Sequence, residues 1–150
     1  MKRISALFVV VLLFIIYSCN EVEEAVFKDV KGVYKGVAKA YLTITIDISK
    51  QDKDKLEGMV KFEVNKEKLP EGDTLIKYLP TEDSVIKGEI ALSHIVLATT
   101  EYKVTVDSKE VPVSIVFEFT RSEDGKKLLG NMTFSGVSDL GEIPVELTKQ

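Results

Sequence analysis

The sequence predicts an all-β protein whose antiparallel strands follow one another as an up-and-down meander and close into a barrel of about eight to ten strands. Three observations support this fold class. Apolar residues recur at every second position over most of the chain after residue 31, as expected when successive side chains leave opposite faces of a strand. Short, acidic polar segments separate the alternating stretches. Helical spacing of apolar residues is confined to residues 21–29.

The first 18 residues have the pattern of a secretion signal. Lys2 and Arg3 form a short positive region, and an unbroken apolar run follows from Leu7 to Tyr17. A membrane-spanning helix needs about 20 apolar residues, so this run is too short to remain as one. We therefore expect residues 1–18 to be removed as a signal peptide, which leaves Cys19 at the start of the mature chain.

Residues 19–31 are expected to connect this Cys to the folded domain. Residues 20–24 contain three carboxylates, for which a solvated tether is the simplest interpretation. The apolar spacing within residues 21–29 is compatible with one or two turns of helix. The barrel domain is then expected to occupy residues 32–150.

The longest alternating stretch covers residues 34–48, where every even position is apolar or Gly. At about 3.3 Å per residue it would span roughly 50 Å, longer than a typical strand, so we expect a break near Gly36 or at residues 38–40. Further strands are expected at residues 56–64, 75–79, 86–92, 102–106, 113–119, 128–134 and 143–147.

Polar segments at residues 51–54, 81–84 and 122–125 are expected to be hairpin connections between these strands. The single apolar face must then be buried, either against a second sheet or by curling the sheet closed. Closure removes exposed strand edges and is favoured for that reason. A β-sandwich is the alternative.

The composition excludes several classes of function. A net charge of −4 argues against a nucleic-acid surface, which needs clustered Lys and Arg. One Cys excludes an internal disulfide and a multi-Cys metal site. The only His, His94, is in phase with Ile90 and Leu92, so we expect it to be a hydrogen-bonded core or rim residue. We therefore predict no catalytic residue, no metal and no cofactor.

Residues 16–19, Ile-Tyr-Ser-Cys, resemble the lipobox of bacterial lipoproteins, in which a small residue precedes a Cys that is lipidated before cleavage. Tyr17 departs from the small or aliphatic residue that is usual at its position. The resemblance implies lipidation of Cys19 and attachment to the cell envelope of a Gram-negative-type bacterium. Because no Asp follows the Cys, it favours the outer membrane, with the periplasmic and surface faces both open.

Residues 27–34, Phe-Lys-Asp-Val-Lys-Gly-Val-Tyr, resemble the amino-terminal motif of lipocalin-like (calycin) barrels. Phe27, Val30 and Gly32 match that motif, and Tyr34 stands where the family has Trp. Arg121, a candidate for the family's basic residue that caps this aromatic, lies in an expected hairpin rather than in the last strand. The resemblance implies an up-and-down barrel whose open mouth can hold a small apolar ligand. The alternative is that Gly-x-Tyr simply begins a strand.

Two functional hypotheses follow. The first is a non-enzymatic, lipid-anchored envelope protein whose barrel binds a small hydrophobic molecule. Its candidate cavity is lined by Tyr34, Leu42, Ile44, Phe62, Ile90 and Phe117. The second is a β-sandwich interaction module displayed on the outer membrane for adhesion, complex assembly or inhibition.

Two short triplets concern modification. Residues 73–75, Asp-Thr-Leu, and residues 83–85, Asp-Ser-Val, resemble the acceptor motif for O-glycosylation in some bacterial envelope proteins. The resemblance makes Thr74 and Ser84 candidate glycosylation sites. Both residues are expected in loops or at the start of a strand.

Overall fold

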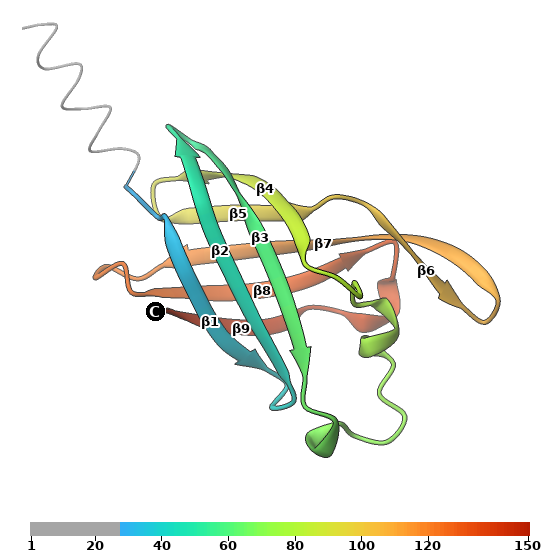
Figure 1. Ribbon diagram of the computed structural model, residues 1–150. Helices are drawn as coiled ribbons and strands as arrows, with labels where there is room; N and C mark the ends of the chain where they lie inside the picture. The colour runs from blue at the N-terminus through green and yellow to red at the C-terminus, as the bar shows by residue number, and fades with distance from the viewer. Residues whose placement is uncertain (1–27) are drawn as a thin grey trace, which may run out of the picture.

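In a computed structural model, residues 28–150 are described, and they form strands and short 3-10 helices (Figure 1). The strands are β1 (Gly32–Ala38), β2 (Leu42–Asp52), β3 (Lys55–Val64), β4 (Ser84–Ala91), β5 (His94–Thr99), β6 (Tyr102–Val106), β7 (Lys109–Arg121), β8 (Lys127–Ser135) and β9 (Ile143–Lys149). The 3-10 helices are η1 (Lys66–Lys68), η2 (Leu75–Tyr78) and η3 (Ser138–Leu140). The all-β prediction is confirmed, whereas the signal peptide, Cys19 and most of the acidic tether lie outside the described residues.

The strands close into a barrel. They hydrogen-bond in the order β5-β4-β3-β2-β1-β9-β8-β7-β6, and β5 also pairs with β7. All pairings are antiparallel. β1 to β5 and β7 to β9 therefore form a closed ring, and β6 pairs only with the first part of β7 among the described strands. This closure excludes the β-sandwich alternative. Figure 1 shows the β6–β7 hairpin projecting from the barrel.

The long alternating stretch is interrupted at the second of the two predicted places. β1 ends at Ala38 and β2 begins at Leu42, and these two residues are paired across the turn. Lys39 and Ala40 adopt positive φ angles of 50° and 55°, a conformation that non-glycine residues use mainly in tight turns. The break therefore produces a compact hairpin at one end of the barrel.

Three predictions about local structure are wrong, and β5 was not predicted. Residues 81–84, expected to be a hairpin connection between two strands, instead lead from η2 into β4. Residues 75–79 contain η2 instead of a strand, because the connection from β3 to β4 crosses the end of the barrel rather than following its wall. His94 is exposed, whereas Ile95 and Leu97 are buried. The cause is the turn before β5, in which Leu92 takes a φ of 58° and is 72% exposed. After this turn the odd-numbered residues of β5 face inward, whereas the even-numbered residues of β4 do.

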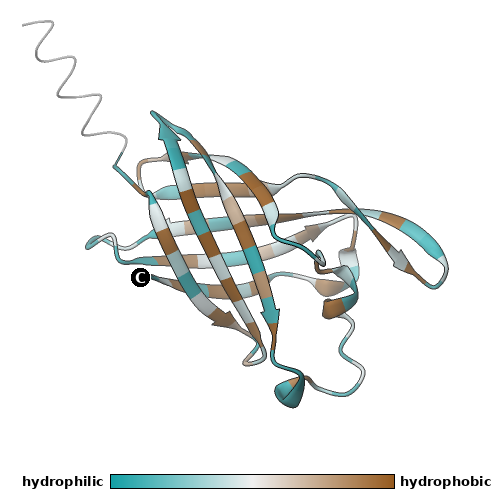
Figure 2. Ribbon diagram, viewed as in Figure 1, coloured by the Kyte–Doolittle hydropathy of each residue, from teal (hydrophilic) through white to brown (hydrophobic). Residues whose placement is uncertain are grey.

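Hydrophobic side chains fill the interior. Figure 2 shows the alternation directly as hydrophobic and hydrophilic bands along β2, where Ile44, Ile46 and Ile48 are buried. Every described strand of the closed ring contributes to one continuous hydrophobic cluster. Burying one such aliphatic side chain stabilises the fold by about 1.5–3 kcal/mol. The predicted enclosure of the apolar face is therefore confirmed.

Four glycines allow the strands to coil tightly. Gly36, Gly58, Gly88 and Gly130 occupy positions of the inward-facing series, where a Cβ would collide with a backbone carbonyl oxygen of the adjacent strand. At Gly88 the obstructing atoms belong to Val96 and Leu97 of β5. Glycine in a strand commonly marks such a close backbone approach. These positions permit the curvature that closure requires.

We predict that Gly88→Ala lowers the free energy of unfolding by about 3 kcal/mol, because the added methyl group forces β4 away from β5. Urea unfolding followed by circular dichroism measures this loss. Gly72→Ala is the matched control. Gly72 has a φ of 80°, but no atom lies within 4 Å of the added Cβ, so this variant loses only about 1 kcal/mol through backbone strain. Equal losses in the two variants would contradict the close-approach explanation.

Candidate functional site

One end of the barrel is covered by the chain between β3 and β4, residues 65–83, which we call the β3–β4 connection. It contains η1 and η2 and crosses the end where the β1–β2 turn also lies (Figure 1). Leu75 is completely buried and Leu79 nearly so, and both belong to the hydrophobic cluster of the barrel. Half-buried side chains such as Phe62 and Leu69 pack against the same cluster. The connection therefore inserts apolar side chains into the barrel's end.

Asp73 attaches this connection to the barrel wall. Its Oδ2 accepts a hydrogen bond of 2.6 Å from the Tyr41 hydroxyl, and its Oδ1 accepts one of 2.8 Å from the Leu75 N–H. Lys39 Nζ lies 3.9 Å from Oδ2. Burial acts to raise the pKa of Asp73, but the two hydrogen bonds and Lys39 outweigh it, so the pKa is lowered. Burial and the carboxylate raise the pKa of Tyr41, so its hydroxyl stays a donor.

A second tyrosine ties the connection to β6. The Tyr102 hydroxyl donates a 2.7 Å hydrogen bond to the Tyr78 carbonyl oxygen at the end of η2. Burial raises the pKa of Tyr102, so this phenol also remains protonated and able to donate. The connection is thus held by polar contacts at two separate places, with the buried Leu75 between them in the chain and Leu79 directly after the second.

The opposite end is closed by residues around Tyr34. The buried Tyr34 hydroxyl donates to the Val30 carbonyl oxygen at 3.0 Å, and Arg121 Nη2 donates to the Asp29 carbonyl oxygen at 3.3 Å. Lys149 of β9 places its Nζ 5.6 Å from the centre of the Tyr34 ring, within cation–π range. Burial raises the pKa of Tyr34, and Arg121 partly offsets that effect. The last strand therefore does supply a cation to this aromatic, from Lys149.

The structure brings the six predicted cavity residues together inside the barrel. Tyr34, Leu42, Ile44, Ile90 and Phe117 are each at most 1% exposed. Phe62 is half-buried and stacks on Phe117 with ring centres 6.3 Å apart. The side chains come from β1, β2, β3, β4 and β7. Their inward orientation was predictable from period two, whereas their mutual packing depends on closure.

A groove on the outside of the barrel was missed by the sequence interpretation. It has a volume of about 570 Å³ and lies between residues 76–85 and residues 100–105. None of the six predicted cavity residues lines it. Of the two candidate glycosylation sites, Thr74 is exposed at the start of η2, and Ser84 is partly exposed and lines this groove. No local pattern identifies the groove, because its two walls are separate in sequence.

Metal and membrane signatures can be assessed for the described residues. Between residues 28 and 150, no three His, Cys, Asp or Glu side chains are grouped so that they could hold a metal ion. The same part of the chain contains no helix of the length and apolar character that crossing a membrane requires. The groove and the barrel interior are therefore the two places where we consider binding.

We predict that acidification weakens the Asp73 contacts. Because the folded-state pKa of Asp73 is lowered, its contribution to stability is complete above the unfolded value of about 3.9 and is lost as the pH falls through the folded value. The Leu75 amide proton, followed by NMR, should therefore titrate with a midpoint below 3.8. Tyr41→Phe should raise this midpoint, and Tyr78→Phe, which removes a hydroxyl of the same connection that does not bond to Asp73, should not. An unchanged midpoint in Tyr41→Phe contradicts the assignment.

Comparison with known proteins does not assign this chain to a family. No family model matches the chain, and no curated protein and no solved structure matches it either. What is shown is an eight-stranded, closed antiparallel barrel that is compatible with a lipocalin-like architecture. The function is therefore argued from the chain's own geometry.

Proposed function

We propose that this chain is a lipid-anchored, non-enzymatic protein of the bacterial cell envelope whose lipocalin-like barrel binds a small hydrophobic molecule. The observation that carries the proposal is an apolar barrel interior whose one end is covered by connections between strands, chiefly the β3–β4 connection, with Val137 and Leu140 of the β8–β9 connection also packed against the core. An eight-stranded barrel is wide enough to be filled by side chains or to hold one small ligand.

The interior favours an apolar ligand. Among the described residues, Thr99 is the one buried polar side chain outside the tyrosines, and its Oγ1 already accepts a 2.9 Å hydrogen bond from the Ile115 N–H. The hydroxyls of the buried Tyr34 and Tyr41 also have partners. Among the described residues, the buried side-chain atom left without a hydrogen-bond partner is Arg121 Nε, at the end closed by Tyr34. A polar ligand that enters beside the β3–β4 connection would therefore find no free side-chain partner there and would be penalised by desolvation. A hydrocarbon chain would not carry this desolvation penalty.

The β3–β4 connection is the part of the barrel that can open at the lowest cost. Its short 3-10 helices have weaker hydrogen bonding than the strands, and segments of this kind open locally more readily than sheet cores. If Leu75 and Leu79 withdraw, they vacate space within the hydrophobic cluster. A hydrophobic ligand would then occupy the volume that these two side chains leave.

The proposed anchor is compatible with this entrance. Residue 28, where the described chain begins, lies beside the end closed by Tyr34 and Arg121 (Figure 1). The β3–β4 connection covers the opposite end. A lipid on Cys19 would therefore attach the closed end toward the membrane and leave the connection accessible to incoming ligand.

We expect the full chain, in a mild nonionic detergent, to bind 11-(dansylamino)undecanoic acid with increased fluorescence. Ile44→Phe should weaken binding about tenfold or more, because the interior then excludes roughly two methylene groups of the probe. Thr45→Phe is the control, since Thr45 is the next residue along β2 and faces outward.

Equal affinities in the two variants would show that the probe binds outside the barrel. Native mass spectrometry of the wild-type chain extracted from its host's membrane provides a second measurement that needs no substitution. It should detect a copurifying apolar molecule that is absent from the Ile44→Phe variant. Copurification with both proteins in equal amount contradicts an interior site.

The lipid anchor has its own test. Cys19→Ala should shift the protein from the detergent-dependent membrane fraction to the aqueous fraction, because the thiol that carries the lipid is lost. Ser18→Ala, which keeps a small residue before the Cys, should leave the distribution unchanged. Metabolic labelling with radioactive palmitate should mark the wild type and Ser18→Ala but not Cys19→Ala. Label on the Cys19→Ala chain would refute the assignment.

A further inference from the structure

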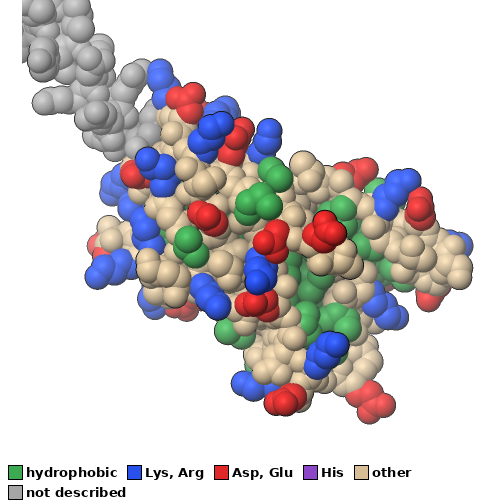
Figure 3. Space-filling view, in the orientation of Figure 1, with side chains coloured by type: hydrophobic (Ala, Val, Ile, Leu, Met, Phe, Trp, Pro, Cys, Tyr) green, Lys and Arg blue, Asp and Glu red, His purple; other side chains and the backbone are tan. Residues whose placement is uncertain are grey.

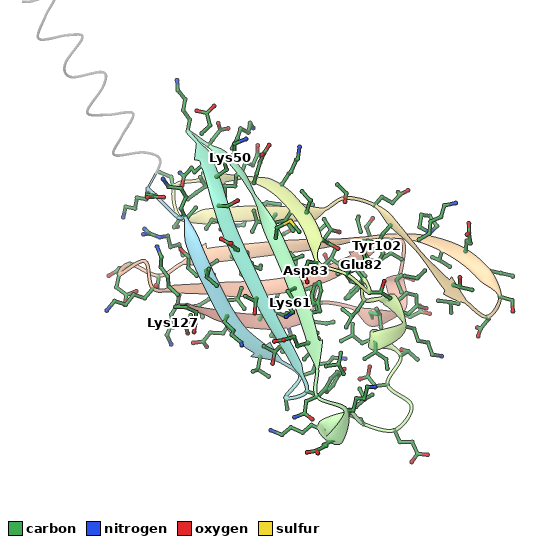
Figure 4. The ribbon with its side chains drawn as sticks, in the orientation of Figure 1. Lys50, Lys61, Glu82, Asp83, Tyr102 and Lys127 are labelled. Atoms are coloured by element: carbon green, nitrogen blue, oxygen red, sulfur yellow. The ribbon has the colours of Figure 1, made fainter. Side chains whose placement is uncertain are left out.

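We infer that the groove beside β6 binds an extended peptide segment, which adds a strand to the free edge of β6 and places a basic side chain beside Glu82 and Asp83. This site lies outside the barrel interior, although Leu79 borders both. It is lined by η2, the residues that lead into β4, and β6 (Figure 4). The inference therefore does not depend on ligand binding inside the barrel.

The first support is an unpaired strand edge. Within the described chain, β6 pairs with β7 alone. Asp107 and Ser108 both have positive φ angles, 49° and 65°, which form a tight two-residue hairpin turn. Val106–Lys109 is then a hydrogen-bonded pair, and so is Val104–Val111.

The alternation of an antiparallel ladder fixes what the free edge presents. Because Val104 and Val106 direct their backbone groups toward β7, Lys103 and Thr105 direct their N–H and C=O groups away from it. Four backbone groups are therefore available along one edge. Such an edge is a template for an added strand, and recognition by strand addition uses these backbone hydrogen bonds for affinity.

The second support is an apolar surface beside that edge. Ile76 and Val85 are 36% and 41% exposed and line the groove together with Leu79 and the half-buried Val104. Figure 3 shows hydrophobic side chains in a hollow on this face, with acidic side chains at its border. A strand added about 4.8 Å from β6 would direct alternate side chains into this hollow. Residues with apolar side chains at every second position would fit it.

The third support is the charge at the groove's border. Glu82 and Asp83 line the groove and lie on the same face as Tyr102 (Figure 4). Neither carboxylate forms an ion pair with another described residue. By contrast, Lys103 is already paired with Glu110 at 2.9 Å. The residue of the peptide that lies next to Glu82 and Asp83 is therefore expected to be Lys or Arg, whereas a residue facing Lys77 of η2 is not.

The shape of the groove favours a single extended segment over a second copy of this chain. The residues between η2 and β4 form a wall opposite β6. We expect a single strand to lie between these two walls. A second copy would have to insert its whole β6–β7 hairpin there.

The test uses the full ¹⁵N-labelled chain in a mild nonionic detergent and a seven-residue synthetic peptide. The peptide has Val at its second and sixth positions, Lys at its fourth and Thr elsewhere, with blocked termini. Binding should shift the NMR signals of Lys103 and Thr105 and slow hydrogen exchange of their amides. Two further peptides carry N-methyl groups on either the even or the odd residues. Only one edge of the peptide faces β6, so one of these peptides should bind and the other should not.

Two protein variants test the edge and the charge separately. Thr105→Pro should abolish binding, because proline removes an edge N–H and obstructs the edge. Asp83→Lys should weaken binding about fivefold, as expected for loss of an exposed charge pair. Glu123→Lys makes the same charge change in the β7–β8 turn, away from the groove, and should leave the affinity unchanged.

Three results would overturn the inference. Equal binding of both N-methylated peptides would show that the contact is not strand addition. Signal changes confined to the barrel interior would assign the peptide to the ligand site of the proposed function instead. A dimer that Thr105→Pro disrupts and that excludes the peptide would show that the edge serves a second copy. Failure of the fatty-acid probe to bind, by contrast, leaves this inference unaffected.

Discussion

The closing pairs between the first and last strands are the constraint on which the rest of the structure depends. Tyr34, Lys35 and Gly36 of β1 pair with the end of β9, although more than a hundred residues separate them in sequence. Without these pairs the sheet would have two open edges and one exposed apolar face. With them, the inward side chains of every strand in the ring meet in a single core, and the glycines that allow tight coiling acquire their role.

Closure also creates two ends with different character. At one end, the chain before β1 accepts hydrogen bonds from the Tyr34 hydroxyl and from Arg121 of β7, and Lys149 of β9 lies over the Tyr34 ring. At the other, a connection with little regular structure covers the core and is held by Asp73 and by the Tyr102 hydroxyl. This asymmetry leaves one end closed by side chains packed on the strands and the other covered by a connection held at a few polar contacts. It is the physical basis for placing ligand entry at the β3–β4 connection.

The free edge of β6 arises because the β6–β7 hairpin extends beyond the end of the closed ring of strands. β5 pairs with β4 up to Thr99, and the chain then continues into β6, which keeps β7 as its partner. Thr99 compensates locally, since its hydroxyl accepts the Ile115 N–H. β4 begins too late in the chain to cover the extended hairpin. The groove and the unpaired edge are thus two consequences of one mismatch in strand length.

The sequence by itself determined the fold class, most of the strands and most of the core, because period two assigns inward residues such as Ile44 and Phe117 locally. It did not predict β5, and it left two places open for the break that the structure puts after Ala38. The prediction of inward and outward positions failed at His94, because the turn before β5 changes which residues of the next strand face inward. The prediction of a strand failed at η2, because that segment leaves the barrel wall. Only the tertiary structure decided that residues 76–85 and 100–105 face one another across a groove, and that Lys149 lies over Tyr34. These contacts join parts of the chain whose spacing carries no local signal, since closure alone brings them together.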